Sequence, residues 1–289
     1  MTMPTHVGII DCMIGFPDPD PRRIYEFFRG NLKDAESRET MFPVEYLFKD
    51  NVPGALAGGV DPVAVTVGEM TKYGIERGLI GCEDRVSQRA LREHPERFIA
   101  STNADANDIL GAVRKIRRLK DEFDIRAVGT FPAGCTPQIP ISDAKWYPVY
   151  ATCAELGIPI FICAGIPGPR LPSLCQHVEM LDIVCYDFPE LTIVTRHGCQ
   201  PWTELMVKLM LKWPNLHYST SAFAPKHYDS RIIEYANTRG ADRVIYAGYV
   251  PMGLTLERIF TDMPNVPLKD DVWPKFLRDN AMRVLGLDR

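Results

Sequence analysis

One histidine in this 289-residue chain lies where proton transfer is expected. His197 ends the apolar stretch Leu191–His197 and is followed at once by a glycine. The ordinary pKa of imidazole is near neutral pH, so the side chain can give and take a proton there. Asp11 and Cys163 also stand at the ends of apolar stretches, as candidates for a base or orienting carboxylate and for a nucleophile. A nucleophilic Cys163 would need His197 close enough to hold it as a thiolate.

Each of these residues also has a structural alternative. His197 could form hydrogen bonds only within the protein, Asp11 could hold backbone amides together, and Cys163 could be an inert core thiol. Side chains that could bind an anionic substrate lie near the same stretches: Arg196, Arg170, Lys226, Tyr228 and Tyr249. Trp202 could wall the pocket, with plain packing as the alternative. Lys226 and Tyr228 follow a serine-containing stretch that could cradle an anion or could simply be a solvated loop.

Short apolar stretches recur along the whole chain. Their continuity, without polar alternation, is typical of parallel strands that are covered on both faces. The expected strands are Val7–Cys12, Gly78–Cys82, Phe98–Asn103, Arg126–Phe131, Pro159–Ala164, Leu191–His197, His217–Ser221 and Arg243–Tyr249. The expected helices between them include Asp108–Phe123, Asp143–Leu156, Ser173–Tyr186, Pro201–Trp213 and Tyr228–Arg239. This alternation predicts an α/β fold, a (β/α)₈ TIM barrel, with a doubly wound open sheet as the alternative.

Reactive side chains of such a barrel stand at the carboxyl ends of its strands, where His197, Asp11 and Cys163 are expected. The chain length suits a single barrel domain over residues 1–289. Residues 31–59 form a polar, proline-containing insertion near the predicted mouth, either a lid or dimer arm or a structural excursion. Residues 270–289 are expected to form a closing helix.

Composition excludes several classes of function. The formal net charge of −4 gives no general attraction to nucleic acid or to an anionic membrane. No apolar run approaches the roughly 20 residues that span a bilayer, and the first residues lack the pattern of a signal peptide. The eight cysteines form no CxxC pair, so reduced, buried thiols are expected. We therefore expect a cytoplasmic protein that binds neither nucleic acid nor membrane.

Five stretches together resemble the amidohydrolase-2 family, the branch of the amidohydrolase superfamily related to aminocarboxymuconate semialdehyde decarboxylase. They are Ile9-Ile10-Asp11, residues 158–165, His197-Gly198-Cys199-Gln200-Pro201-Trp202, residues 243–251 and residues 280–287. They span nearly the whole chain in the family's order. The resemblance implies an amidohydrolase-type barrel, a homodimer, and His197 as the family's catalytic histidine that does not bind metal.

The chain departs from the family at the metal ligands. Where the family has two histidines after the first aspartate, this sequence has Met13 and Gly15. Cys163 stands at the position of the third histidine, and Tyr249 at that of the last aspartate. Zinc needs three or four ligands in a defined geometry, so we expect neither a catalytic metal nor another cofactor. The alternative is a rearranged site in which Glu83, Asp84 or Asp105 converges on His197.

These features favour an enzyme, a hydrolase or a decarboxylase-like lyase, that acts on a small carboxylated or acyl metabolite. In this reading His197 is the acid–base group, and an anionic small molecule is the partner. The changed ligand positions favour the alternative, a catalytically inactive barrel that binds a metabolite or a protein.

Overall fold

A computed structural model of the protein describes residues 3–48 and 53–287. Eight parallel strands follow one another around a single sheet in chain order. They are β1 (Ile9–Asp11), β2 (Ile75–Gly81), β3 (Phe98–Asn103), β4 (Ala127–Thr130), β5 (Ile160–Cys163), β6 (Ile193–Arg196), β7 (Leu216–Ser219) and β8 (Val244–Ile245). The predicted TIM barrel is confirmed, and the open sheet is excluded because neighbours in the sheet are always neighbours in the sequence.

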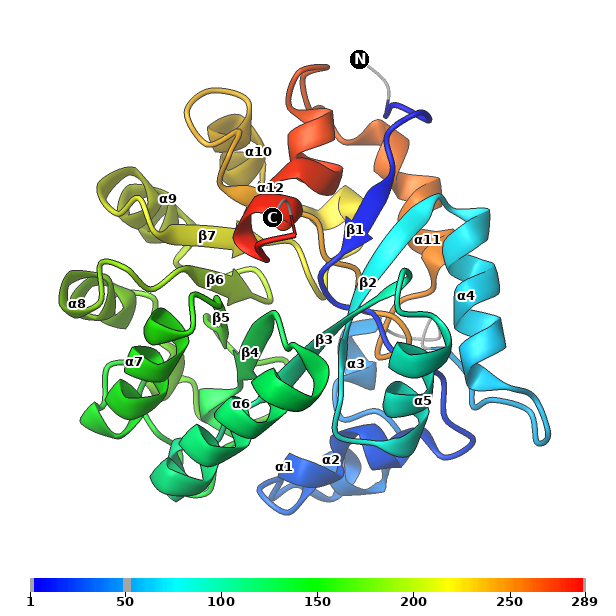
Figure 1. Ribbon diagram of the computed structural model, residues 1–289, viewed down its shortest axis with the longest axis horizontal. Helices are drawn as coiled ribbons and strands as arrows, with labels where there is room; N and C mark the ends of the chain where they lie inside the picture. The colour runs from blue at the N-terminus through cyan, green and yellow to red at the C-terminus, as the bar shows by residue number, and fades with distance from the viewer. Residues whose placement is uncertain (1–2, 49–52, 288–289) are drawn as a thin grey trace.

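Helices surround the strands (Figure 1). They are α4 (Pro62–Lys72), α5 (Arg85–Glu93), α6 (Ile109–Phe123), α7 (Tyr147–Glu155), α8 (Met180–Asp187), α9 (Thr203–Lys212), α10 (Ser230–Ala236) and α11 (Leu256–Asp262). Aspartates accept backbone hydrogen bonds at the beginning of several helices, which satisfies amides that have no partner within the helix. The capping residues include Asp61, Asp84, Asp108 and Asp229.

The seam between β8 and β1 is closed by few contacts. The Cys12 amide donates to the Tyr246 carbonyl at 3.4 Å, and Ile14 forms an isolated parallel bridge with Val250. The predicted last strand extended to Tyr249, but β8 is only two residues long. Side-chain hydrogen bonds are therefore important for holding this seam together.

The interior of the barrel is filled by side chains from alternate strand positions. One buried cluster joins Ile10, Leu79, Phe161 and Val194 to residues of α12 (Asn280–Val284). The predicted closing segment is a π-helical turn, Lys275–Asp279, followed by α12. Its last two residues, 288 and 289, lie outside the described part of the chain.

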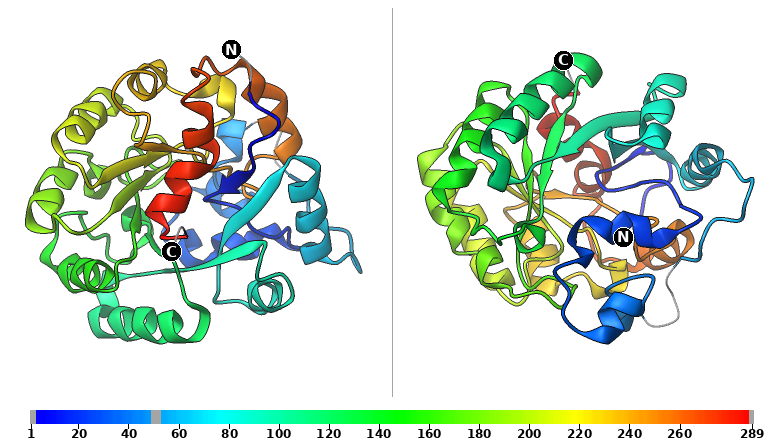
Figure 2. Two further views of the ribbon diagram at one scale, coloured as in Figure 1. Left: turned by 45° about the horizontal axis from the view of Figure 1, so that its top comes forward. Right: turned by 90° about the horizontal axis from the view of Figure 1, so that it is seen from below.

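The segment that follows β1, here called the N-terminal excursion, covers the end of the barrel opposite to α12. It contains α1 (Glu26–Arg29), α2 (Ala35–Glu39) and α3 (Glu45–Phe48). The two views of Figure 2 show this blue segment and the red C-terminal helix on opposite sides of the strands. Of the predicted insertion at 31–59, residues 49–52 lie outside the described residues.

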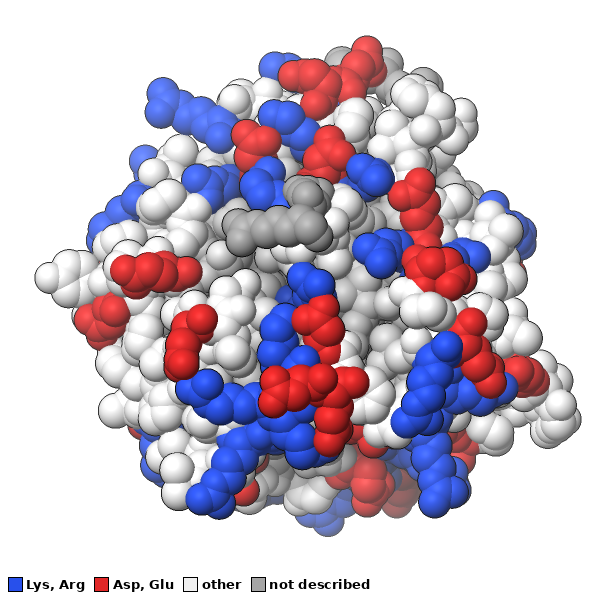
Figure 3. All heavy atoms as spheres, viewed as in Figure 1, with Lys and Arg blue, Asp and Glu red and all other residues white. Residues whose placement is uncertain are grey.

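The surface carries charges of both signs. Lys and Arg side chains are interspersed with Asp and Glu on the face shown in Figure 3. The basic residues of α6 form ion pairs, such as Arg117 with Glu155 and Arg118 with Glu122. Among the helices of the described ranges, none has both the length and the apolar character needed to cross a membrane.

Candidate functional site

His197 follows β6 directly and is held by the loop after β7. Its backbone amide donates to the Ser221 hydroxyl at 3.1 Å, and its Nδ1 lies 3.2 Å from the same oxygen. The Tyr249 ring packs edge-on against the imidazole, with 5.3 Å between ring centroids. The half-buried imidazole is thus fixed from β7 and β8 while it remains near the carboxyl ends of the strands.

Backbone strain is concentrated around this contact. His197 and Cys199 have positive φ angles of 65° and 56°, and Ala222, which follows Ser221, has one of 72°. Residues with a Cβ seldom adopt this conformation, and they occur preferentially at functional sites, where the surrounding structure imposes it. The strain therefore singles out the His197–Ser221 contact within the barrel mouth.

The surroundings of His197 keep its imidazole neutral. Burial lowers the pKa of His197 to about 3, and the positive charge of Arg196 lowers it further. Both effects disfavour the imidazolium form. In the free protein His197 is therefore a neutral donor and acceptor near pH 7.

Arg196 points into the barrel interior. Its guanidinium lies over the ring of Phe161, with 5.0 Å to the ring centroid. A Cβ on Gly129 would lie 2.7 Å from Arg196 Nη1 and 2.5 Å from the Asn103 side-chain oxygen. Glycine on β4 thus leaves the room that the arginine occupies.

Asp11 stabilises the seam of the barrel. Its Oδ1 accepts hydrogen bonds from the amides of Met13 at 2.9 Å and Gly248 at 2.8 Å. Burial raises the pKa of Asp11 to about 7, although both amides act in the opposite direction. Asp11 thus holds backbone amides together, as expected if its role is structural. Among the described residues, no hydrogen bond joins Asp11 to His197.

Cys163 is buried at the end of β5, opposite Arg196 on β6. Burial raises the pKa of its thiol to about 12, so the thiol is protonated at neutral pH. In the described structure His197 Nδ1 approaches Ser221, and no hydrogen bond joins it to Cys163. The geometry therefore lacks the contact that a nucleophilic Cys163 would require.

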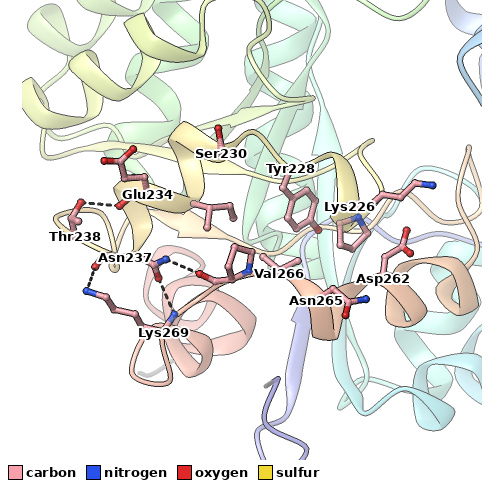
Figure 4. A pocket seen from close by; sticks show the side chains of 13 residues that line it. Lys226, Tyr228, Ser230, Glu234, Asn237, Thr238, Asp262, Asn265, Val266 and Lys269 are labelled. Carbon is pink, nitrogen blue, oxygen red and sulfur yellow. Dashed lines mark hydrogen bonds between the residues drawn. The ribbon is translucent and has the colours of Figure 1, made fainter. Parts of the chain in front are cut away.

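Lys226 and Tyr228 line a groove at the periphery of the barrel. Figure 4 shows this groove between the segment around α10 and the segment that follows α11. Asn237 and Asp262 line the same groove, whereas His197 and Arg196 are not part of it. The Tyr228 ring packs against Phe276. The structure leaves Lys226 in this groove, outside the barrel mouth. Burial raises the pKa of the Tyr228 hydroxyl, and this hydroxyl lies close enough to Thr220 and Asp11 for both to act on that pKa.

Two further candidates have structural partners. Arg170 donates to Asp34 at 2.7 Å and to Glu36 at 2.8 Å, which joins the loop after β5 to the N-terminal excursion. Trp202 precedes α9 and packs on His177, with 4.1 Å between ring centroids.

An aromatic cluster covers the mouth. Buried side chains of the N-terminal excursion, among them Phe28 and Phe42, pack with Phe131 from the loop after β4 and Tyr249 from the loop after β8. The Tyr25 hydroxyl also donates to the Met252 carbonyl at 2.7 Å. We call residues 21–48 the covering segment, because their contacts reach loops at the carboxyl ends of the strands.

The side chains present do not fit a metal site of the family type. Within residues 3–48 and 53–287, no three His, Cys, Asp or Glu side chains are grouped to hold a metal ion. The carboxylates of the rearranged-site alternative have other partners. Glu83 accepts from Lys115 Nζ at 3.0 Å, and Asp84 and Asp105 cap the beginnings of helices.

Two residues of this site were missed in the sequence interpretation. Ser221 ends the predicted strand His217–Ser221, but the sequence does not identify His197 as its partner, because that contact depends on the pairing of β6 and β7. Gly129 lies inside a strand, where glycine often marks a close approach by another group. That signal was present in the sequence, but it does not identify Arg196 as the neighbour.

Solved structures with the same fold include an uncharacterized protein and two decarboxylases. An uncharacterized TIM-barrel protein from Bordetella bronchiseptica is 23% identical, with 97% of this chain and 99% of that chain covered and a TM-score of 0.72. A 2,6-dihydroxybenzoate decarboxylase from Rhizobium is 15% identical, with coverage of 98% and 100% and a TM-score of 0.66. The 5-carboxyvanillate decarboxylase of Novosphingobium aromaticivorans, solved with manganese, is 15% identical, with coverage of 97% and 96% and a TM-score of 0.67. At these identities the likeness establishes the fold.

The sequence itself identifies the family. A search of curated proteins gives no match for this chain. The family description "Amidohydrolase" (Amidohydro_2) matches residues 49–287, which include all strands from β2 to β8. The chain therefore belongs to the amidohydrolase family, as the five sequence stretches predicted.

Proposed function

We propose that the protein is a lyase that removes the carboxylate of a small carboxylated compound as CO₂, without a catalytic metal and with His197 as the proton carrier. The observation that carries this proposal is the strained, Ser221-held imidazole beside a cationic guanidinium at the barrel mouth. Two of the structural neighbours are decarboxylases of carboxylated aromatic compounds, which supports this choice of reaction.

The reaction needs one proton at the carbon that bears the carboxylate. The carbon–carbon bond then breaks, CO₂ leaves, and the proton replaces it on that carbon. Burial is the larger cause of the low pKa of His197, and the charge of Arg196 is the smaller one. A bound carboxylate would offset the charge of Arg196, and its own negative charge would favour the imidazolium form. His197 would then take up a proton from water as the substrate binds and deliver it to the substrate carbon.

The test is decarboxylation of ¹³C-carboxyl-labelled 2,6-dihydroxybenzoate and 5-carboxyvanillate, followed by NMR as the release of labelled CO₂. We expect His197→Asn to slow turnover by at least about 100-fold. A matched control, His6→Asn, changes an exposed histidine near the N-terminus and should leave turnover unchanged. Unchanged turnover in His197→Asn would remove this histidine from the mechanism.

Hydrolysis remains the second candidate reaction. Turnover of acyl esters and amides of the same compounds tests it in parallel. The non-catalytic barrel is favoured by the changed ligand positions Met13, Gly15, Cys163 and Tyr249. Binding of these carboxylates without turnover of any of them would support that alternative. Elemental analysis of protein purified without chelator tests the proposal that catalysis needs no metal. One equivalent of a bound transition metal would overturn that proposal.

Oligomeric state and location stay predictions. Exposed apolar side chains on the covering segment, such as Phe27 and Leu47, support a role for it as the arm of a homodimer. Light scattering would test the dimer, and fractionation of expressing cells would test the cytoplasmic location.

A further inference from the structure

Within residues 3–48 and 53–287, the guanidinium of Arg196 has no counter-ion. Among the described residues it forms neither a hydrogen bond nor an ion pair, and its Nε is buried without any partner. Most buried charges in proteins are paired, because an unpaired charge loses its hydration without compensation. An unpartnered arginine inside a barrel is therefore a costly feature.

The barrel is built to accommodate this charge. Gly129 leaves space beside Nη1, and the Phe161 ring lies beneath the guanidinium. The thiols of Cys12 and Cys163 are near enough to interact electrostatically with the arginine. The one carboxylate of β1, Asp11, instead directs its Oδ1 to the amides of Met13 and Gly248. The surrounding side chains thus provide room and an aromatic face, and the negative charge is left to a ligand.

We infer that Arg196 is the carboxylate receptor of this barrel. The planar guanidinium binds the carboxylate through two parallel N–H···O bonds, which fixes the orientation of the substrate as well as its charge. This inference rests on the proposed function and extends it, because it assigns the group that holds the leaving carboxylate.

The same geometry defines the substrate class. One unpartnered cation matches one carboxylate, and the rings of Phe131 and Tyr249 over the mouth match a flat, apolar body. The positive charge of Arg196 acts on the His197 imidazole and disfavours its protonation, so a carboxylate held on the guanidinium would also lie near that imidazole. The expected ligand is a monocarboxylate on an aromatic ring.

Calorimetric titration with benzoate and with neutral benzamide tests the inference without requiring turnover. We expect the wild-type protein to bind benzoate at least about 30-fold more tightly than benzamide, and Arg196→Met to lose this preference. Arg196→Lys keeps a charge without the planar guanidinium and should retain only part of the preference for benzoate. Arg117→Met removes an exposed arginine that is paired with Glu155. This control variant should keep the full preference for benzoate.

Gly129→Ala is a second probe that leaves the charge in place. Its Cβ would displace the ends of two flexible side chains, Arg196 and Asn103, so we expect a preference between those of the wild type and Arg196→Met. This variant and Arg196→Lys keep the test decisive if Arg196→Met fails to fold. Equal or undetectable binding of the two ligands by wild type, or full preference in a folded Arg196→Met, would overturn the inference.

The outcomes separate this inference from the proposed function. An Arg196-dependent preference for benzoate in a protein that decarboxylates nothing would support the receptor and refute the lyase. Turnover by a protein whose preference survives in Arg196→Met would support the lyase and refute the receptor.

Discussion

Arg196→Met should make the ligand-free protein more stable, although it removes a large side chain from the barrel. The reason is that wild-type Arg196 keeps a charge and an unpartnered Nε within the barrel interior. An unsatisfied buried donor costs about 1–3 kcal/mol, and more when the group is charged. Methionine carries no polar hydrogen and adapts its shape to irregular space.

Two losses reduce this gain. The contact between the guanidinium and the Phe161 ring is worth about 0.5–2 kcal/mol, depending on how far it is desolvated. Methionine is also shorter than arginine and leaves part of the space beside Gly129 unfilled. Because Arg196 is only half-buried, we take the lower end of each range, a gain of about 1 kcal/mol less a loss of about 0.5 kcal/mol, and expect a net stabilisation of at most about 0.5 kcal/mol. For a chain of this size that corresponds to a rise in Tm of about 1 °C.

The assay is urea unfolding followed by circular dichroism, with an unchanged m-value as the check that the two proteins unfold alike. Arg117→Met is again the control, because an exposed ion pair contributes at most about 1 kcal/mol. Benzoate at saturating concentration should then raise the Tm of the wild type but not that of Arg196→Met. A destabilisation of Arg196→Met by more than about 2 kcal/mol would show that the guanidinium has stabilising partners, and it would refute the reasoning.

Three further predictions concern other parts of the structure. Burial lowers the pKa of His217 to about 3, so the unfolded chain binds its proton first and the contribution of His217 to stability falls as pH drops from 6.5 toward 3. At pH 5 this loss is about 2 kcal/mol, and urea midpoints at pH 7.5 and 5.0 should show a smaller loss in His217→Gln; equal losses would contradict the assignment. Asp11→Ala should lower the free energy of unfolding by about 2–4 kcal/mol because two seam amides lose their acceptor, whereas Asp11→Asn keeps an oxygen and should lose less. If Asp11→Asn keeps its stability but loses turnover, Asp11 has a catalytic role. Phe42→Ala leaves a cavity in the aromatic cluster over the mouth and should speed proteolysis within residues 31–48 by more than about tenfold; an unchanged cleavage pattern would show that the cluster does not hold this segment in place.

The barrel could be predicted because its determinants are local. Continuous apolar strands separated by amphipathic helices, as in Arg126–Phe131 followed by Asp143–Leu156, leave few architectures that bury both faces of a parallel sheet. His197 could be predicted for the same reason, since the end of such a strand faces the mouth wherever the barrel closes. The errors at strand ends, such as the short β8, arise where backbone pairing gives way to side-chain contacts.

What the sequence could not decide is the direction and partner of each polar side chain. Asp11 lies between Ile10 and Cys12, two residues of the barrel interior, so strand alternation turns its carboxylate to the seam. Lys226 lines a groove outside the mouth, and the carboxylates that pair with Arg170 lie more than a hundred residues away in the chain. The sequence determined the barrel, the family and the place of His197, because local patterns specify them. Only the tertiary structure decided that Arg196 lies in the interior with no counter-ion in the described part of the chain, because that depends on eight strands closing around one side chain.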